Sequence, residues 1–212
     1  MTERTRIGRL AERGVTDMEQ IRAILNEGVV CHVGFSVDGQ PYVMPMAYGH
    51  EGGQLYLHGS VMSRLAKSLA EGIPVCVTVT LVDGLVLARS AFHHSMNYRC
   101  AVVLGRAREL TTQEDKMKAL RCITNHVVPN RWAEVRPPNA EEIAATTVLA
   151  LPLDELSAKV RKGPPKDDAA DMGLRVWAGV IPLRTVMGEP VADGDAASYF
   201  VMPAFLKSPD LK

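Results

Sequence analysis

The chain has 212 residues and a mass of 23.1 kDa, with 47% hydrophobic and 23% charged residues. A chain of this size buries roughly 70% of its unfolded surface, so this composition is typical of a folded globular protein and excludes a disordered chain. The 24 Lys and Arg residues balance the 24 Asp and Glu residues, which argues against non-specific nucleic-acid binding, because that needs surplus positive charge to displace counterions.

The first predicted element is a helix over residues 17–27. Thr16 and Glu19 have the spacing of a capping box, in which each side chain satisfies a backbone N–H of the other residue. Gly28 follows the last residue of the periodic pattern, where helices commonly end. A short N-terminal helix is therefore expected.

Three β-prone runs follow this helix, at residues 29–37, 42–48 and 54–58. Asp38-Gly39 between the first two runs is the strongest type of two-residue hairpin signal. Gly52-Gly53 predicts a second tight turn before the third run. Because turns this short join only antiparallel strands, the pattern predicts a meander.

From Met62 the hydrophobic period becomes that of a helix, with apolar residues at Met62, Leu65, Ala66 and Leu69. Gly72 and Pro74 end the pattern. Three further apolar runs predict strands at 75–81, 85–90 and 100–109. Asp83-Gly84 predicts a tight turn between the first two of these strands.

A second long helix is marked by Met117, Leu120, Ile123 and Val127 and is opened by Thr111 and Glu114. Asn139 and Glu142 predict the capping box of a shorter helix. Two last strands are expected at 147–153 and 176–181, on either side of a polar, proline-rich loop at 162–168.

The whole pattern predicts a single domain over residues 1–212, with its core at about 15–190 and a C-terminal tail at 191–212. The expected fold is mainly β, with about six to eight mostly antiparallel strands and flanking helices. Closure of such a sheet into a small barrel would remove its exposed edges.

The four cysteines are too far apart for a CxxC pair or zinc-ligand spacing, so buried, reduced thiols are expected at Cys31, Cys76, Cys100 and Cys122. The N-terminal arginines precede no apolar stretch, which argues against a classical signal peptide, and no window approaches the ~20 apolar residues of a membrane span. We therefore expect a cytoplasmic protein that binds neither membrane nor nucleic acid.

The best candidate site lies where the third strand runs into the following helix. Gly59 permits close approach of a ligand to the backbone, and Ser60, Ser63 and Arg64 add two hydroxyls and a cation beside the N–H groups of a helix start. This combination suits a phosphate group. In the alternative interpretation, Ser60 or Ser63 only caps the helix and Arg64 lies on its solvent-facing side.

At these residues the sequence resembles the FMN-binding split β-barrel proteins related to pyridoxamine 5′-phosphate oxidase, most closely the branch of the nitroimidazole-resistance proteins. The resemblance covers roughly residues 15–190. It rests on the order and spacing of five segments: 41–48 (PYVMPMAY), 55–60 (LYLHGS), Ser63-Arg64, 95–99 (SMNYR) and 102–107 (VVLGRA).

The resemblance implies that one strand lies along the isoalloxazine ring of FMN, at Val43, Met44, Pro45 and Met46. It also implies that Ser63 and Arg64 hold the FMN phosphate. The oxidase pattern has a lysine after Ser-Arg, where this chain has Leu65. Lys67 is two residues farther along the helix and points well away from that direction, so a weaker phosphate site than that of the oxidase is expected.

Residues 91–99 are unusually rich in polar and aromatic groups. The resemblance implies that this stretch borders the flavin, partly across a dimer interface, with cofactor or substrate contacts from Ser95, Asn97, Tyr98 and Arg99. A solvated hairpin end is the alternative. His93 and His94 suggest a metal, but neighbours on a strand face opposite sides, so no metal site is expected.

Three further positions have both a functional and a structural interpretation. His58, at a strand end expected to face the phosphate site, either donates to the flavin or is a structural histidine. Trp177 either approaches the flavin of a neighbouring subunit, as an aromatic near the C-terminus does in related barrels, or is a core residue. The basic residues Lys159, Arg161 and Lys162 either meet an anionic substrate or are only solvated.

The resemblance implies a homodimer that binds FMN between its subunits and transfers hydride or electrons from a reduced nicotinamide to a small oxidised molecule. The flavin would perform this chemistry, so no acid–base pair is required. A flavin carrier, store or sensor without turnover is an alternative, and so is a related barrel that binds haem or the deazaflavin F420. The sequence identifies neither the electron donor nor the acceptor.

Overall fold

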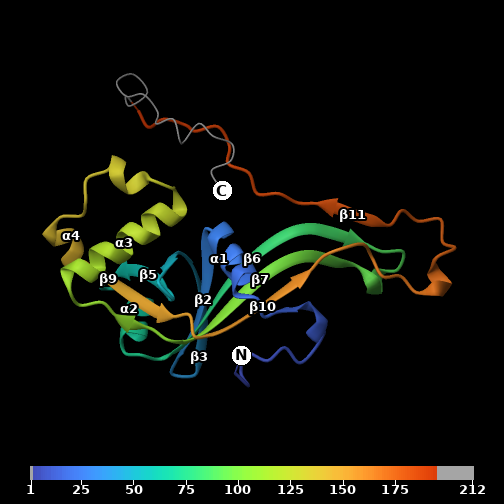
Figure 1. The fold of residues 1–212 in the computed structure, drawn as a ribbon, viewed down its shortest axis with the longest axis horizontal. Helices are drawn as coiled ribbons and strands as arrows, with labels where there is room; N and C mark the ends of the chain where they lie inside the picture. The colour runs from blue at the N-terminus through green and yellow to red at the C-terminus, as the bar shows by residue number, and fades with distance from the viewer. Residues whose placement is uncertain (1, 195–212) are drawn as a thin grey trace.

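The computed structural model describes residues 2–194 and shows two β-sheets with helices around them (Figure 1). In this part of the chain every strand pairing is antiparallel. The predicted fold class, mainly β and antiparallel with flanking helices, is confirmed. The predicted tail at 191–212 lies mostly outside the described residues.

The larger sheet has the strand order β1-β10-β7-β6-β2-β3, and β11 pairs with β6 outside this path. Its members are β1 (Gly14–Val15), β2 (Val30–Val37), β3 (Gln40–Ala47), β6 (Pro74–Leu87), β7 (Ser95–Arg106), β10 (Glu155–Arg161) and β11 (Gly179–Pro182). The hairpin from β2 to β3 is confirmed, because Asp38 and Gly39 have φ angles of 51° and 79°, the left-handed pair that a tight hairpin turn requires.

The smaller sheet has the order β4-β5-β9-β8. Its strands are β4 (Gly49–Glu51), β5 (Gln54–Ser60), β8 (Arg108–Glu109) and β9 (Thr146–Pro152). The prediction of a single meander was wrong, because the third strand, β5, pairs with β4 and β9 and not with β3. The chain crosses from the larger to the smaller sheet at Tyr48, which the core buries completely.

The structure has four α-helices in its described part: α1 (Met18–Glu27), α2 (Arg64–Ala70), α3 (Gln113–Val127) and α4 (Ala140–Ala144). The predicted capping box of α4 is confirmed. Two predicted caps were wrong by one residue, because Asp17 caps α1 and Thr112 caps α3. In both helices the capping oxygen accepts a hydrogen bond from a first-turn N–H, as N-cap residues do.

The predicted turn at Asp83-Gly84 was also wrong, because β6 runs through it with a register shift between Val82 and Gly84. Gly84 instead allows the backbone of β11 to come close. A Cβ atom at Gly84 would lie 3.0 Å from the carbonyl oxygen of Ile181. The glycine thus marks a bulge with close backbone packing, which sequence alone does not distinguish from a turn.

Two stretches of strand were not predicted from the sequence, because they contain many polar residues. Residues 95–99, predicted to be a site or a hairpin end, form the first part of β7 and pair with β6. Lys159 and Arg161, predicted to belong to a basic cluster, lie on β10. This strand alternates buried and half-buried positions, with Leu156 and Ala158 facing the core, as expected for a strand with one buried face.

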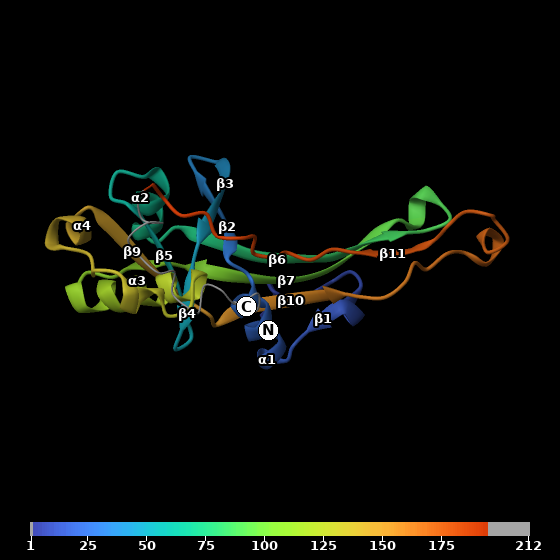
Figure 2. The same ribbon diagram turned by 90° about the horizontal axis from the view of Figure 1, so that it is seen from above.

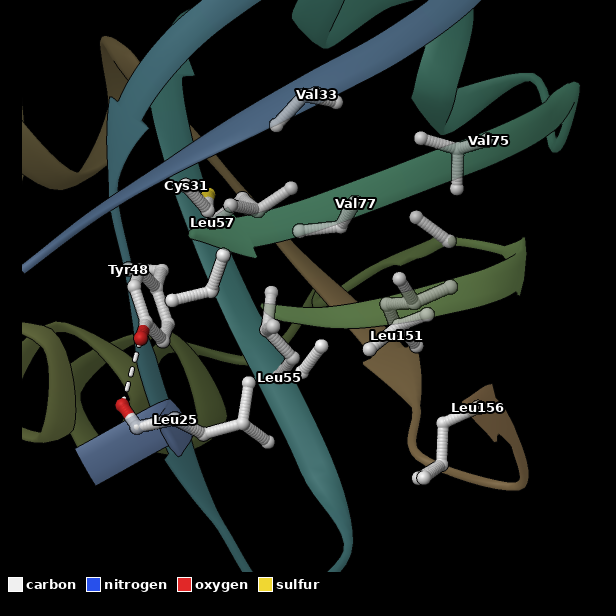
Figure 3. Close-up of a cluster of buried hydrophobic side chains, with 14 of the residues drawn as sticks. Leu25, Cys31, Val33, Tyr48, Leu55, Leu57, Val75, Val77, Leu151 and Leu156 are labelled. Carbon is white, nitrogen blue, oxygen red and sulfur yellow. Dashed lines mark hydrogen bonds between the residues drawn. The ribbon is translucent and has the colours of Figure 1, made fainter. Parts of the chain in front are cut away.

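The main hydrophobic core lies between the two sheets (Figure 3). The larger sheet contributes residues such as Val33 and Val77, and the smaller sheet contributes Leu57 and Leu151. Helix α1 packs against this core, and the Tyr48 hydroxyl donates a hydrogen bond of 2.6 Å to the carbonyl oxygen of Leu25 (Figure 3). The fully buried Tyr48 therefore has a partner for its polar group, as a buried hydroxyl requires.

Helix α3 covers the other face of the smaller sheet. Ala119 and Ile123 of α3 join Tyr56 and Val148 in a second buried cluster. A Cβ atom at Gly49 would lie 2.8 Å from the backbone nitrogen of Ile123. The missing side chain therefore lets β4 lie directly against the backbone of the helix.

Residues 82–99 and 162–183 form an extension that we call the arm. It carries the ends of β6 and β7 and all of β11, and it projects from the rest of the molecule on the side away from α2 (Figures 1 and 2). Arg161 lies at the base of the arm and stabilises it by donating hydrogen bonds to the Asn97 side chain and to the carbonyl oxygens of Gly163 and Pro164. Asp167 accepts two hydrogen bonds from Arg89 farther out on the arm.

Candidate functional site

Two serine hydroxyls accept hydrogen bonds from backbone amides at the junction between β5 and α2. The Ser60 hydroxyl accepts a hydrogen bond of 3.2 Å from the Met62 amide, and the Ser63 hydroxyl accepts one of 3.0 Å from the Ala66 amide. Ser63 therefore has the capping role of the alternative interpretation, whereas Ser60 stabilises the turn that precedes the helix. The amides of Arg64 and Leu65 belong to the first turn, which offers no intrahelical acceptor, so they point out of the helix start.

Arg64 is exposed and lies above an aromatic ring. Its guanidinium carbon is 4.9 Å from the ring centroid of Tyr42 on β3, and the Tyr42 ring stacks on Phe35. Within residues 2–194, Arg64 forms no ion pair with a carboxylate. The ring therefore positions a cation whose N–H donors remain available to an anion.

Strand β3 presents its predicted site residues on two different faces. The register places Tyr42 opposite Phe35 and Met44 opposite Val33, so Met44 and Met46 share the face of Tyr42. Val43 and Pro45 lie on the outer face of the larger sheet, where Val43 is 64% exposed. Only Met44 and Met46 of the predicted ring-binding strand thus share the Arg64 side.

His58 does not face the junction, contrary to expectation. It pairs with Val148, which belongs to the cluster beneath α3, whereas a Cβ atom at Gly59 would lie 3.7 Å from the Ser63 hydroxyl. Successive strand residues face opposite sides, so His58 points toward the side that α3 covers. Its Nδ1 is buried and has no hydrogen-bond partner in the described part of the chain, and burial lowers the His58 pKa.

The structure explains the departure from the family pattern at Leu65. This side chain is buried in the main core, so its position does not face the outside of the junction. Lys67 is exposed farther along α2. Arg64 is therefore the cation that α2 presents beside Tyr42.

Arg99 has a structural role within one chain. Its guanidinium donates to both oxygens of Asp83, at 2.9 and 2.7 Å, and also to the Glu27 carboxylate. The hydrogen bonds that its guanidinium donates to these two carboxylates raise the Arg99 pKa above its ordinary value. Arg99 thus joins the end of α1 to β6, and both of its partners compete with any anionic ligand.

The other residues predicted to contact the cofactor or substrate lie on the arm, away from the junction. Asn97 is buried and accepts a hydrogen bond from Arg161, while Ser95 and Tyr98 are half-buried. Trp177 is 64% exposed, so the interpretation as a core residue was wrong. The arm and α2 lie at opposite ends of the molecule (Figures 1 and 2), so one chain does not bring these two groups of residues together.

The two adjacent histidines have separate neighbours. His93 lies 3.1 Å from the Asp168 carboxylate, and His94 donates from Nδ1 to the Ser90 carbonyl oxygen. Over residues 2–194, no three side chains from His, Cys, Asp or Glu are grouped so that they could hold a metal ion. None of the helices in this same range is long and apolar enough to span a membrane.

A hollow of about 250 Å³ between β4 and α3 shares no residue with the junction. It is lined by His50, Glu51, Arg121, Cys122, Asn125 and His126. His126 donates a hydrogen bond of 2.7 Å to the Gly28 carbonyl oxygen, which ties α3 to the end of α1. Sequence analysis did not identify this hollow, because its lining comes from two segments far apart in the chain.

Sequence analysis also missed Tyr42 as a site residue. Its contact with Arg64 joins β3 to α2, and no local spacing indicates such a contact. Tyr42 did lie in one of the segments that carry the family resemblance, and this was the only available signal.

Antiparallel sheets around a common core, with a cationic junction at the start of α2, define a split-barrel protein. The family model described as pyridoxamine 5′-phosphate oxidase matches residues 17–160. The chain belongs to this family. No curated protein matches the sequence.

Several solved structures are similar to this chain, and three of them are described here. The flavocytochrome Anf3 from Azotobacter vinelandii is 39% identical, with a TM-score of 0.90 over 96% of this chain and 94% of that one. The FAD and heme binding protein from Mycobacterium smegmatis is 36% identical, with a TM-score of 0.86 over 91% and 94%. A putative 5-nitroimidazole antibiotic resistance protein from Bacteroides thetaiotaomicron is 27% identical, with a TM-score of 0.59 over 69% and 86%.

Proposed function

We propose that this protein binds a flavin nucleotide at the β5–α2 junction and uses it to transfer hydride or electrons from a reduced nicotinamide to a small oxidised molecule. The observation that carries this proposal is the exposed Arg64 guanidinium, which lies over Tyr42 and has no carboxylate partner in the described residues. A phosphate would provide the anion that this guanidinium lacks.

The residues at the junction fit such a ligand. Arg64 and the outward-pointing amides of the first turn of α2 would hold the phosphate, while Met44, 47% exposed beside Tyr42, offers apolar surface to a ring. When bound, the flavin supplies the redox chemistry. The chain's own residues bind and orient the cofactor, and Tyr42 keeps the guanidinium in place.

The similar structures support a flavin without deciding which nucleotide it is. The family resemblance predicted FMN, whereas the Mycobacterium smegmatis protein is described as binding FAD and heme. We propose FMN as the cofactor, and mass spectrometry of the ligand that co-purifies would distinguish it from FAD and from a deazaflavin. A homodimeric assembly and a cytoplasmic location are parts of the same proposal.

Substitution of Arg64 tests the binding site. The purified protein should absorb at about 370 and about 450 nm. Arg64→Ala should weaken flavin binding by about 10- to 100-fold, as expected for loss of a hydrogen-bonded charge. Lys67→Ala, which removes an exposed cation from the same helix, is the matched control and should bind like the wild type. Equal flavin affinity in both variants would refute the proposed site.

Reduction by nicotinamides tests the reaction. Anaerobic NADH or NADPH should bleach the flavin bands, and a nitroaromatic compound or a quinone should then restore them. If neither donor bleaches the flavin, the oxidoreductase proposal fails and the carrier or sensor alternative replaces it.

Haem, in addition to flavin, is a second candidate ligand. The observation that favours it is the buried His58 Nδ1 without a hydrogen-bond partner in the described residues, on a histidine whose burial lowers its pKa and so favours the neutral, metal-binding form. The structures that are 39% and 36% identical are described as a flavocytochrome and as a FAD and heme binding protein.

Absorption also tests the haem candidate. A Soret band at about 400 nm should be present in the purified protein. His58→Ala should remove this band but retain the flavin bands, whereas Arg64→Ala should do the reverse. If the protein purified from cells supplied with haem shows no Soret band, haem is excluded.

A further inference from the structure

A second hollow, of about 310 Å³, lies between the N-terminal segment and the outer face of the larger sheet, and we call it the β10 hollow. Cys100 and Val102 of β7 line it, and so do Ser157 and Lys159 of β10. The register pairs Cys100 with Lys159 and Val102 with Ser157, so these four side chains lie together on the face that points away from the main core. Sites for small molecules usually have volumes of about 300–1,000 Å³.

The N-terminal segment forms the other wall of the β10 hollow and lies beside β10 (Figure 1). Ile7 and Arg9 of this segment line the hollow. Arg4 forms an ion pair with Glu155 of β10. The Lys159 ammonium donates a hydrogen bond of 3.0 Å to the Arg9 carbonyl oxygen. Strand β1, which follows the segment, also pairs with β10, so this wall is held in place at both of its ends.

Much of the lining of the β10 hollow is apolar. Ile7 and Val102 contribute hydrocarbon surface, and both are half-buried. Burial raises the pKa of the Cys100 thiol, so Cys100 is a neutral, weakly polar group at neutral pH. No Asp or Glu is among the residues that line the hollow. An apolar ligand therefore finds hydrocarbon contacts there, and an anionic ligand meets no negative charge.

Lys159 places a positive charge beside this apolar surface. Its ammonium has three N–H donors, one of which is directed to the Arg9 carbonyl oxygen. Within residues 2–194, neither Lys159 nor Arg9 forms an ion pair with a carboxylate. The Ser157 hydroxyl adds another donor at the same wall. These groups can therefore hold an anion by charge-assisted hydrogen bonds.

The three basic residues that the sequence grouped at 159–162 have different environments in the fold. Arg161 is buried and donates to neutral acceptors at the base of the arm. Lys162 is exposed and does not line the β10 hollow. Lys159 is the member of this group that lines a hollow. The expectation that the group meets an anion is therefore restricted to Lys159.

We propose that the β10 hollow binds a small carboxylic acid with an apolar body, such as an aromatic acid. The carboxylate accepts hydrogen bonds from Lys159 and Ser157, and the hydrocarbon body lies against Ile7 and Val102. A polar body, such as a sugar, fits this wall less well, because it would lose its hydrogen bonds to water without gaining partners. The hollow shares no residue with the β5–α2 junction, so this inference goes beyond the proposed function and does not depend on it.

Benzoate is the probe that tests this site, because it joins a carboxylate to an apolar ring. Titration followed by amide chemical shifts in NMR spectra should give a dissociation constant of about 1 mM or lower. The largest shift changes should lie at residues 7–9, 100–102 and 157–159. Benzyl alcohol, which lacks the charge, and acetate, which lacks the ring, should each bind at least about tenfold more weakly.

Three outcomes of this titration would overturn the proposal. The first is that benzoate causes no shift changes at a concentration of about 10 mM, well above the expected dissociation constant. The second is that the largest changes lie outside the three segments that line the hollow. The third is that benzyl alcohol or acetate binds as tightly as benzoate.

Substitution of Lys159 tests the role of the charge. Lys159→Gln should raise the dissociation constant for benzoate by about tenfold or more, because a charged hydrogen-bond donor is lost. Lys162→Gln is the matched control, since it removes the same charge from an exposed residue outside the hollow, and it should bind benzoate like the wild type. Equal affinities of the two variants would contradict the assigned role of Lys159.

A second variant keeps Lys159 and its hydrogen bond to the N-terminal segment. Val102→Phe fills the β10 hollow with a larger side chain and should abolish benzoate binding, which keeps the site testable if Lys159→Gln fails to fold. Wild-type affinity for benzoate in Val102→Phe would also overturn the proposal. Neither variant alters the β5–α2 junction, so flavin absorption should be the same in both as in the wild type.

Discussion

Two buried titratable side chains, Cys31 and Tyr48, lie in the core between the sheets. Both are completely buried, and burial raises the pKa of the Cys31 thiol to about 12 and raises the Tyr48 pKa above its ordinary value. Each residue therefore stays neutral in the folded protein at neutral pH. The expectation of a reduced, buried thiol is confirmed at Cys31, whereas the other three cysteines are only half-buried.

This shift predicts a loss of stability at alkaline pH. The folded-state pKa of Cys31 is raised from 9.0. The neutral thiol therefore makes its full contribution to the free energy of unfolding below pH 9, and this contribution decreases as the pH rises toward the folded-state value. At a pH of about 10.5 the loss amounts to about 2 kcal/mol. Urea unfolding at several pH values should show a steeper decline in the wild type than in Cys31→Ala.

Cys76→Ala is the control for this experiment. Cys76 is half-buried on β6, so its thiol retains contact with water and its removal should leave the alkaline decline unchanged. Identical pH profiles for the wild type and Cys31→Ala would show that the thiol ionises in the folded state as readily as in the unfolded one.

At the scale of elements, one ion pair holds the loop between β10 and β11 against Arg89, in the segment that follows β6. The Asp167 side chain is 2% exposed, while its neighbour Asp168 is 74% exposed. Burial alone would raise the Asp167 pKa, but hydrogen bonds from the backbone N–H and the guanidinium of Arg89 lower it below its usual range. Asp167 therefore holds in place a loop that the sequence identified only as polar and proline-rich.

Asp167→Asn should release this loop. Amide hydrogen exchange of residues 162–178 should accelerate by about tenfold or more, since removal of one partner leaves Arg89 unpaired. Because the folded-state pKa of Asp167 is lowered, the stabilisation from the Arg89–Asp167 ion pair is fully present above pH 3.8. It is lost as the pH falls through the folded-state value.

Asp168→Asn is the matched control for loop release, and it should exchange like the wild type at neutral pH. Below the folded-state pKa of Asp167, the protection of this loop in the wild type, after correction for the intrinsic exchange rate at each pH, should fall to that of Asp167→Asn. If both variants exchange at the same rate, the Arg89–Asp167 pair does not hold the loop.

At the scale of the whole molecule, the proposed homodimer would couple folding to association. A protein that folds fully only as a dimer is stabilised by mass action, so its melting temperature rises with protein concentration. We expect a rise of several degrees for the wild type between about 1 and about 100 μM. A melting temperature that is independent of concentration in the wild type would show that folding and association are separate.

Local signals in the sequence determined the helices and the tight turn between β2 and β3. The β2–β3 hairpin follows from Asp38-Gly39, and the α4 capping box follows from Asn139 and Glu142, because each of these signals depends only on residues close together in the chain. The ordered segments from 41–48 to 102–107 likewise indicated the family that the match over 17–160 establishes.

Only the tertiary structure decided which strands pair and which side each side chain faces. Pairing of β5 with β9 directs His58 away from the junction, and the bulge beside Gly84 keeps β6 continuous through a turn-like dipeptide. Contact of Arg64 with Tyr42 and the lining of the β10 hollow also depend on segments that are distant in sequence. Periodicity reports that a residue alternates between two faces, whereas what covers each face is set by packing between distant segments.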